Sequence, residues 1–122
     1  MTNSIGEIKS NDVLFLIGTN TAENHPVIWY QMIRALKTGA KLIVADPRET
    51  EPAKKAHVYL QLRPGTNIAL INGLAHVIIK EKLYDEEFVN SKTEGFAEVA
   101  KAVEKYTPQY VSQVTTVPRS EE

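Results

Sequence analysis

The sequence predicts an α/β fold in which a short parallel sheet is flanked by helices and the last third of the chain is helical. Three observations favour this fold. Val13–Ile17 is a continuous apolar run, typical of a strand buried on both faces, and Lys41–Ala45 predicts a second buried strand. The segment between them has helical spacing, and such a crossover almost always forms a right-handed parallel unit. A third run, Val58–Leu62, is followed mainly by helix-start signals.

The elements of the first half follow from helix and turn signals. Ser4–Asn11 has the composition of a short helix or turn. Pro26 suits the first turn of a helix, because its missing N–H would have no partner there, and apolar residues recur at helical spacing from Ile28 onward. Gly39 is a helix stop signal. After the second strand, the segment DPRETEPAKKA predicts a polar turn and a short helix.

The third strand leads into a helix. Val58–Leu62 alternates more than the other strands, which places it nearer a sheet edge. The Pro-Gly pair that follows predicts a type II turn with Gly65 at the position that needs a positive φ, and Thr66 or Asn67 is suited to cap the next helix. That helix, Ile68–Lys82, is apolar on most sides, so we expect it to be deeply packed.

Cap residues divide the last third of the chain into short helices. Asp85 is suited to cap a helix that runs through Asn90, and Thr93 is suited to cap another that carries an apolar stripe. Thr107 and the proline after it predict a further cap and first turn. Ser120 and the two final glutamates resemble one more helix start, so we expect a piece of a longer protein.

The composition limits the functions that are open to this chain. Its 122 residues are 43% hydrophobic and 24% charged, with a net charge of −1, which is ordinary for a soluble globular domain and gives no indication of nucleic-acid binding. The absence of cysteine excludes disulfides, thiolate catalysis and cysteine-held iron–sulfur or zinc sites within it. Since no signal peptide and no bilayer-length apolar stretch are visible, we expect a cytoplasmic protein without direct membrane insertion.

Polar turns follow all three predicted strands, and ligands of open parallel sheets bind outside the carboxyl ends of the strands. The first turn, GTNTAENHP, leads into a helix N-terminus that attracts anions, and its polar side chains add donors, namely Asn20, Thr21, Asn24 and His25. The alternative is that Asn24 or His25 only caps the helix. We expect all three turns to lie on one edge of the sheet and to contact one ligand.

Asp46 and Arg48 follow the second strand. In dinucleotide-binding folds an acid at this position accepts hydrogen bonds from ribose hydroxyls, and a guanidinium beside it can bind a phosphate with two N–H groups. The alternative is a solvated Asp-Pro turn with an exposed arginine. In the third turn, Gly65 and Thr66 offer backbone N–H groups, and Asn67 can both donate to and accept from a base edge.

The motifs of several enzyme classes are missing from the sequence. Neither G-x-G-x-x-G nor a phosphate loop is present, so conventional NAD binding is not favoured. The three histidines, His25, His57 and His76, have no metal-ligand spacing, and His76 is interpreted as a hydrogen-bonded core residue. No G-x-S-x-G anchors a Ser/His/Asp site. We therefore predict no catalytic residue and no metal ligand in this chain.

A known family carries six similar segments in the same order: TNSIGEI, GTNTAENHP, GAKLIVADPR, LQLRPGTN, ALINGLAHVIIKEKLYDEEFV and KTEGFAEV. They closely resemble the central part of the large subunit of molybdopterin oxidoreductases, nearest to the formate dehydrogenase alpha subunit. The resemblance implies a Rossmann-like, three-layer fold and a single molybdopterin guanine dinucleotide-binding domain over residues 1–122. It also implies a molybdenum or tungsten ion held by two such dinucleotides, in an enzyme that oxidises formate to CO2.

The resemblance assigns roles to the three turns. The phosphate and pterin-linker side would be lined by the first turn, through Gly18, Asn20, Asn24 and His25. The ribose and the guanine nucleotide would be addressed by Asp46 and Arg48. The third turn would lie near the guanine, through Gly65, Thr66 and Asn67. Many members have aspartate where this chain has Asn67, whose single acceptor oxygen does not match both N–H donors of guanine.

The reactive parts of the family have no counterpart in this sequence. The resemblance places a selenocysteine or cysteine on the metal and an iron–sulfur cluster in an earlier segment, and no cysteine is present here. We therefore expect the isolated chain to be inactive and to work with the remaining domains of a large subunit and with electron-transfer subunits. Nitrate reductase and the related subunit of complex I also fit this class. The alternative is an independent or degenerate Rossmann-like nucleotide-binding or structural module without redox activity.

Overall fold

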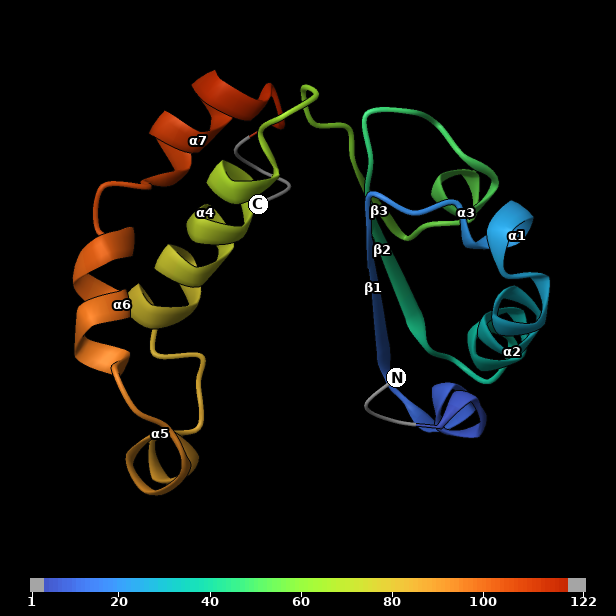
Figure 1. Ribbon diagram of the computed structural model, residues 1–122, viewed down its shortest axis with the longest axis horizontal. Helices are drawn as coiled ribbons and strands as arrows, with labels where there is room; N and C mark the ends of the chain where they lie inside the picture. Colours follow the sequence, from blue (N-terminus) through green and yellow to red (C-terminus); the bar gives the residue numbers. More distant parts are fainter. Residues whose placement is uncertain (1–3, 119–122) are drawn as a thin grey trace. The chain divides into compact units, whose positions relative to one another are not determined.

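The computed structural model describes residues 4–118 and divides into two compact units, Met1–Gln61 and Leu62–Glu122, which are described separately. The first unit contains a 3-10 helix η1 (Ile5–Ser10), three strands and three helices. The strands are β1 (Val13–Ile17), β2 (Lys41–Ala45) and β3 (Val58–Leu60). The helices are α1 (Thr21–Asn24), α2 (Pro26–Lys37) and α3 (Glu51–Lys54). Figure 1 shows both units.

The three strands form one parallel sheet in the order β1-β2-β3. Leu14 pairs with Leu42 across the first two strands, and Val44 pairs with Tyr59 across the second two. The predicted α/β fold with a parallel sheet and flanking helices is therefore confirmed. The position of β3 at a sheet edge is confirmed as well, although this strand ends at Leu60, two residues before its predicted end.

The core of the first unit lies between the sheet and its helices. Figure 1 shows η1, α2 and α3 on one side of the three strands. The buried centre of this layer combines residues from α2, β2 and α3, namely Met32, Leu42, Val44 and Ala53. Leu14 and Leu16 of β1 pack against it from the same face of the sheet. Burial of these side chains is the main contribution that holds the turns after β1 and β2 in place.

The prediction that β1 is buried on both faces is wrong. Val13 is 56% exposed and Phe15 is 44% exposed. Both side chains alternate with Leu14 and Leu16, so they lie on the face of the sheet opposite to α2. A continuous apolar run indicates that both faces are meant to be covered, but it does not say which part of a protein covers them.

The second unit is entirely helical among the described residues, with α4 (Asn67–Lys80), α5 (Glu86–Lys92), α6 (Phe96–Val103) and α7 (Pro108–Thr115). Helix α4 packs against α6 and α7, with Leu70 and Gly73 buried on its inner side. The prediction that this helix is deeply packed is wrong, because Ile68 is 73% exposed and Ile71 is 47% exposed. Its apolar residues surround the helix, whereas its two neighbours cover only part of the surface.

Two of the three predicted caps in the last third are confirmed. The Asp85 side chain accepts a hydrogen bond from Phe88 N–H at 2.9 Å, and Thr107 accepts one from Tyr110 N–H at 3.3 Å. Thr93 does not cap α6; its hydroxyl donates to the Val89 carbonyl at the end of α5, and α6 begins after Gly95, whose φ is +73°. The predicted helix start at Ser120 lies outside the described residues. None of the helices within residues 4–118 has the length and apolarity that a bilayer span needs.

Candidate functional site

The turn after β1 is tied to the neighbouring strand and then forms a short helix. Gly18 has a φ of +60°, and its N–H donates to the Ala45 carbonyl at 3.0 Å, which joins the ends of β1 and β2. The Asn20 carbonyl accepts from Glu23 N–H and Asn24 N–H and so starts α1. Because L residues rarely adopt a positive φ, glycine is the residue that suits position 18.

His25 connects α1 to α2. Its N–H donates to the Thr21 carbonyl and its carbonyl accepts from Trp29 N–H, both at 3.0 Å. The side chains of Asn24 and His25 are exposed and make no cap bond to α2. Neither side chain therefore acts as the cap that the alternative expected. Both remain available to a ligand.

The turn after β2 is organised around the buried side chain of Asp46, which is 3% exposed. Its Oδ1 accepts a hydrogen bond from Arg48 N–H at 2.8 Å, and the Arg48 Nε lies 3.9 Å from the same oxygen. The rest of the Arg48 side chain extends into solvent, with 78% of it exposed. The alternative of a solvated Asp-Pro turn is thus excluded for Asp46, while Arg48 is exposed as that alternative expects.

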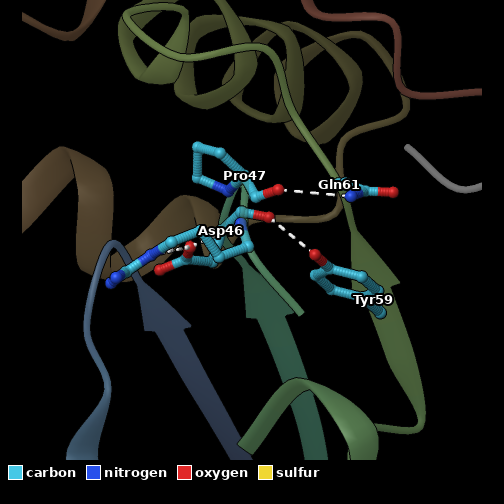
Figure 2. Close-up of polar contacts among 5 residues, drawn as sticks. Asp46, Pro47, Tyr59 and Gln61 are labelled. Atoms are coloured by element: carbon cyan, nitrogen blue, oxygen red, sulfur yellow. Dashed lines mark hydrogen bonds and ion pairs between the residues drawn. The ribbon is translucent and has the colours of Figure 1, made fainter. Parts of the chain in front are cut away.

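Figure 2 shows that β3 holds this turn from the other side. The Asp46 carbonyl accepts from the Tyr59 hydroxyl at 3.0 Å, and the Pro47 carbonyl accepts from Gln61 Nε2 at 3.2 Å. Burial raises the pKa of the Tyr59 phenol, and the negative charges of Asp46 and Glu49 raise it further. Tyr59 therefore stays protonated at neutral pH and remains a donor to the turn.

A pocket of about 340 Å³ brings Asn20 of the first turn and Arg48 of the second turn together. Its other lining residues come from α1, the second turn and α3, namely Glu23, Glu49, Thr50, Glu51 and Lys54. Two buried oxygens of the lining have no hydrogen-bond partner within the described residues, Asn20 Oδ1 and Thr50 Oγ1. A buried polar atom without a partner is costly, so these two oxygens indicate a missing polar partner.

Sequence reasoning missed Thr50 and Lys54. Thr50 precedes the Glu-Pro pair that opens α3, and its backbone occupies the N-cap position although its hydroxyl makes no cap bond. Thr before Glu-Pro is a helix-start signal, but it predicts only the backbone position of Thr50 and not that its hydroxyl faces the pocket. Lys54 lies on the same short helix and adds a second cation to the pocket.

The third predicted turn belongs to the second unit. Thr66 N–H donates to the Arg63 carbonyl at 3.2 Å, and Gly65 has a φ of +81°, as the predicted type II turn requires. Helix α4 begins at Asn67, which is exposed, and Thr66 occupies the cap position without a side-chain cap bond. The expectation that this turn and the other two contact one ligand stays a prediction.

His76 of α4 is a core residue, as predicted. It is 8% exposed, and its Nδ1 lies 3.1 Å from the Val103 carbonyl at the end of α6. An acceptor at that position means that Nδ1 carries the proton. Within residues 4–118, no group of three or more His, Cys, Asp or Glu side chains is arranged to hold a metal ion.

Comparison with known proteins identifies the family. The sequence model of Molybdopterin oxidoreductase matches residues 1–113. The chain belongs to this family. The matched segment includes all three turns and most of the helices of the second unit, so the resemblance drawn from the sequence is confirmed for this molybdopterin oxidoreductase chain.

Curated relatives of this molybdopterin oxidoreductase chain include formate dehydrogenases. It is 50% identical over 117 residues to a formate dehydrogenase alpha subunit of Methanococcus maripaludis, which covers 96% of the chain. It is 49% identical over 121 residues to formate dehydrogenase H of Escherichia coli, which covers 99% of the chain. The chain spans about 17% of the length of these relatives.

A solved structure supports the fold. The chain matches acetylene hydratase from Pelobacter acetylenicus with a TM-score of 0.86 and 35% sequence identity. This match covers 96% of the chain and 18% of that protein. The α/β fold is thus shared with a protein whose name describes a different reaction from that of the formate dehydrogenases.

Proposed function

We propose that this chain holds the guanosine diphosphate part of a molybdopterin guanine dinucleotide, as one domain of a formate dehydrogenase-like enzyme with molybdenum or tungsten. The relatives support this proposal. Their names specify formate, nitrate and acetylene as different substrates, yet they share this segment at 35 to 50% identity. A segment that is common to different reactions is best explained by what the enzymes have in common, which is the cofactor.

The observation that carries the proposal is the pocket with two unpartnered oxygens. Asn20 Oδ1 can only accept, whereas Thr50 Oγ1 can donate and accept. Arg48 and Lys54 supply cations, and Glu23, Glu49 and Glu51 supply acceptors. Such a mixed lining suits a nucleotide better than inorganic phosphate, because a nucleotide combines phosphate acceptors with hydroxyl and N–H donors. The residues present therefore fit the group.

The residues of the first two turns would divide the binding between them. The Arg48 side chain is largely exposed and free to bind a phosphate, with Lys54 as a second cation. Asp46 is buried and does not line the pocket; it accepts from Arg48 N–H through Oδ1 and would position Arg48, with ribose hydroxyls as the partners that the resemblance implies for its remaining lone pairs. Gly18, Asn24 and His25 would face the phosphate and pterin-linker side.

The third turn would recognise the base. Gly65 and Thr66 would offer backbone N–H groups beside the guanine. Asn67 would accept a hydrogen bond from a guanine N–H group through its amide oxygen and donate one to the guanine through its amide N–H₂. When bound, the cofactor supplies the metal at which the substrate exchanges electrons. This chain contributes binding and orientation only, because it lacks the cysteine ligands of an iron–sulfur cluster.

Charge removal in the pocket tests this proposal. In the protein purified from its source, we expect the double variant Arg48→Ala/Lys54→Ala to bind the guanine nucleotide at least about a hundredfold more weakly and so to retain much less of it, since each lost charge-assisted hydrogen bond costs about 1.5–3 kcal/mol and about 1.4 kcal/mol is tenfold. The measurement is the amount of guanosine monophosphate released by acid hydrolysis per polypeptide. Arg34→Ala is the matched control, because Arg34 is an exposed cation on α2 outside the pocket.

Equal guanine content in the double variant and in Arg34→Ala would rule out this pocket as the phosphate site. Adenosine monophosphate in place of guanosine monophosphate would contradict the assignment of the base. Thermal unfolding of each variant distinguishes a lost contact with the nucleotide from a damaged fold. A loss of bound nucleotide with an unchanged unfolding temperature indicates that the substitution affects the site and not the fold.

A further inference from the structure

A second pocket, of about 500 Å³, lies in the second unit and is lined by α4 and α6. Figure 1 shows these two helices beside each other, and they are in contact. The lining residues come from the C-terminal parts of both helices and from Glu104, which follows α6 directly. A volume of this size suits a small organic molecule. None of the lining residues belongs to the candidate nucleotide site, so the pocket requires an explanation of its own.

His76 lines this pocket with one ring nitrogen bonded and the other without a partner. Its Nδ1–H donates to the Val103 carbonyl at 3.1 Å, so Nε2 of the neutral ring is an acceptor. Nε2 is buried and accepts no hydrogen bond from residues 4–118, and the whole residue is only 8% exposed. Because a buried acceptor without a donor costs free energy, the pocket calls for a group that donates.

The charges around the pocket limit what this group can be. A carboxylate has acceptors only, and the C-terminal turns of two helices carry partial negative charge, so an anion is disfavoured. An amine or guanidinium would lie beside Lys80 and Lys101, whose positive charges repel it. A neutral hydroxyl suits both neighbours, since it donates to Nε2 and accepts from a lysine ammonium group.

The wall of the pocket indicates what kind of molecule carries the hydroxyl. Ile79, Ala100 and Val103 provide apolar surface, and the two lysines beside them favour the face of an aromatic ring. We propose that this pocket binds a phenol group. Its hydroxyl donates to Nε2 of His76, and its ring packs against the apolar wall.

Two sources can supply a phenol group: a free phenolic compound, or the tyrosine side chain of a polypeptide segment outside residues 1–122. Both present the same ring and hydroxyl to the pocket, so the experiment below first tests the chemistry and then distinguishes the sources. The inference does not depend on guanine nucleotide binding, because the two sites share no residue.

A pair of matched ligands tests the hydrogen bond. We expect 4-methylphenol to bind the 122-residue chain roughly three- to tenfold more tightly than 4-methylanisole, which keeps the ring and the oxygen but has no O–H to donate. The measurement is a nuclear magnetic resonance titration that follows the ring of His76 and the amide of Ala100, both of which belong to the pocket lining.

His76→Asn removes the acceptor and keeps the core bond. The asparagine N–H₂ group can replace Nδ1–H as the donor to the Val103 carbonyl, but nothing replaces Nε2. The two ligands should then bind with equal affinity. As a second variant, Ala100→Leu fills the pocket without changing His76 and should abolish the binding of both ligands. Ala102→Leu is its matched control, because Ala102 is exposed on the same helix and does not line the pocket.

Equal affinities of the two ligands for the unchanged chain would overturn the proposal, and so would the absence of binding. A preference for 4-methylphenol that persists in His76→Asn would overturn it as well. If His76→Asn does not fold, the ligand pair and Ala100→Leu decide the outcome without it.

The protein purified from its source distinguishes the two sources of the phenol group. Binding of added 4-methylphenol to that protein identifies a free phenolic compound. A crystal structure in which a tyrosine hydroxyl bonds to Nε2, together with no binding of added 4-methylphenol, identifies a tyrosine side chain. A pocket that contains only water or only apolar side chains and binds no added 4-methylphenol would contradict the proposal.

Discussion

At the scale of single residues, Asp46 and Tyr59 show how one polar network shapes the candidate site. Asp46 accepts from the backbone of its own turn, and Tyr59 donates to the backbone carbonyl of Asp46 from the next strand. Each bond holds the turn from a different side. The carboxylate is thus fixed in place before any ligand arrives, which lowers the entropic cost of binding.

The raised pKa of Tyr59 makes the stability of this network depend on pH. The folded state holds the phenol proton more tightly than the unfolded state, whose pKa is near 10.0. The stabilisation is therefore fully present below pH 10 and is lost as the pH rises through the folded-state pKa. We expect the free energy of unfolding of the chain to fall, as the pH rises above 10, more steeply than that of Tyr59→Phe, measured by urea unfolding.

Tyr59→Phe is also the control for lysine titration, which affects both proteins equally. An identical pH dependence in the two proteins would contradict the assignment of the raised pKa to Tyr59.

The sequence was informative about Asp46 and Arg48 because the topological rule for parallel sheets depends only on where a strand ends. It was less informative about Thr50. That residue contributes to the pocket through the path of the chain between β2 and α3, and no local pattern shows which side chain a loop turns inward. The unpartnered oxygens of Asn20 and Thr50 likewise depend on packing that periodicity does not describe.

At the scale of elements, local signals predicted the strands and most helix starts, because proline and cap residues act within one turn of the chain. The predicted cap at Thr93 was wrong, because its hydroxyl donates to a carbonyl of α5. Gly95, in the left-handed backbone conformation, is the residue before α6. The exposed faces of β1 and α4 could not be predicted either. Their apolar residues indicate that these faces are suited to burial, but they do not identify the segment that would bury them.

Helix packing in the second unit depends on a close approach at Gly73. A Cβ at this position would lie 2.8 Å from Val111 Cγ2 of α7 and 3.1 Å from its Cγ1. We expect Gly73→Ala to destabilise the second unit by about 1–3 kcal/mol, because overpacking forces the two helices apart. Chemical denaturation followed by circular dichroism measures the change.

Gly6→Ala is the matched control, because the nearest atom to a Cβ there is 3.8 Å away. Combining Gly73→Ala with Val111→Ala should recover part of the loss, since the smaller side chain removes the clash. A Gly73→Ala chain as stable as the Gly6→Ala chain would show that the helices do not approach as closely as described.

At the scale of the whole molecule, this chain is one part of the family's architecture. It matches the molybdopterin oxidoreductase model over residues 1–113 and spans about 17% of its formate dehydrogenase relatives. Its candidate site combines a polar pocket with the turns after β1 and β2, and among the described residues apolar side chains of β1 and α4 are exposed. These features agree with a domain that positions a cofactor for chemistry carried by other segments.

The most direct test of this account is a joint measurement on the protein purified from its source: polypeptide mass, molybdenum and tungsten content, and the nucleotide released by hydrolysis. We expect a polypeptide several times longer than 122 residues that contains one of these metals and releases guanosine monophosphate. A metal-free polypeptide of about this size, without guanine nucleotide, would contradict the account and leave an independent nucleotide-binding or structural module.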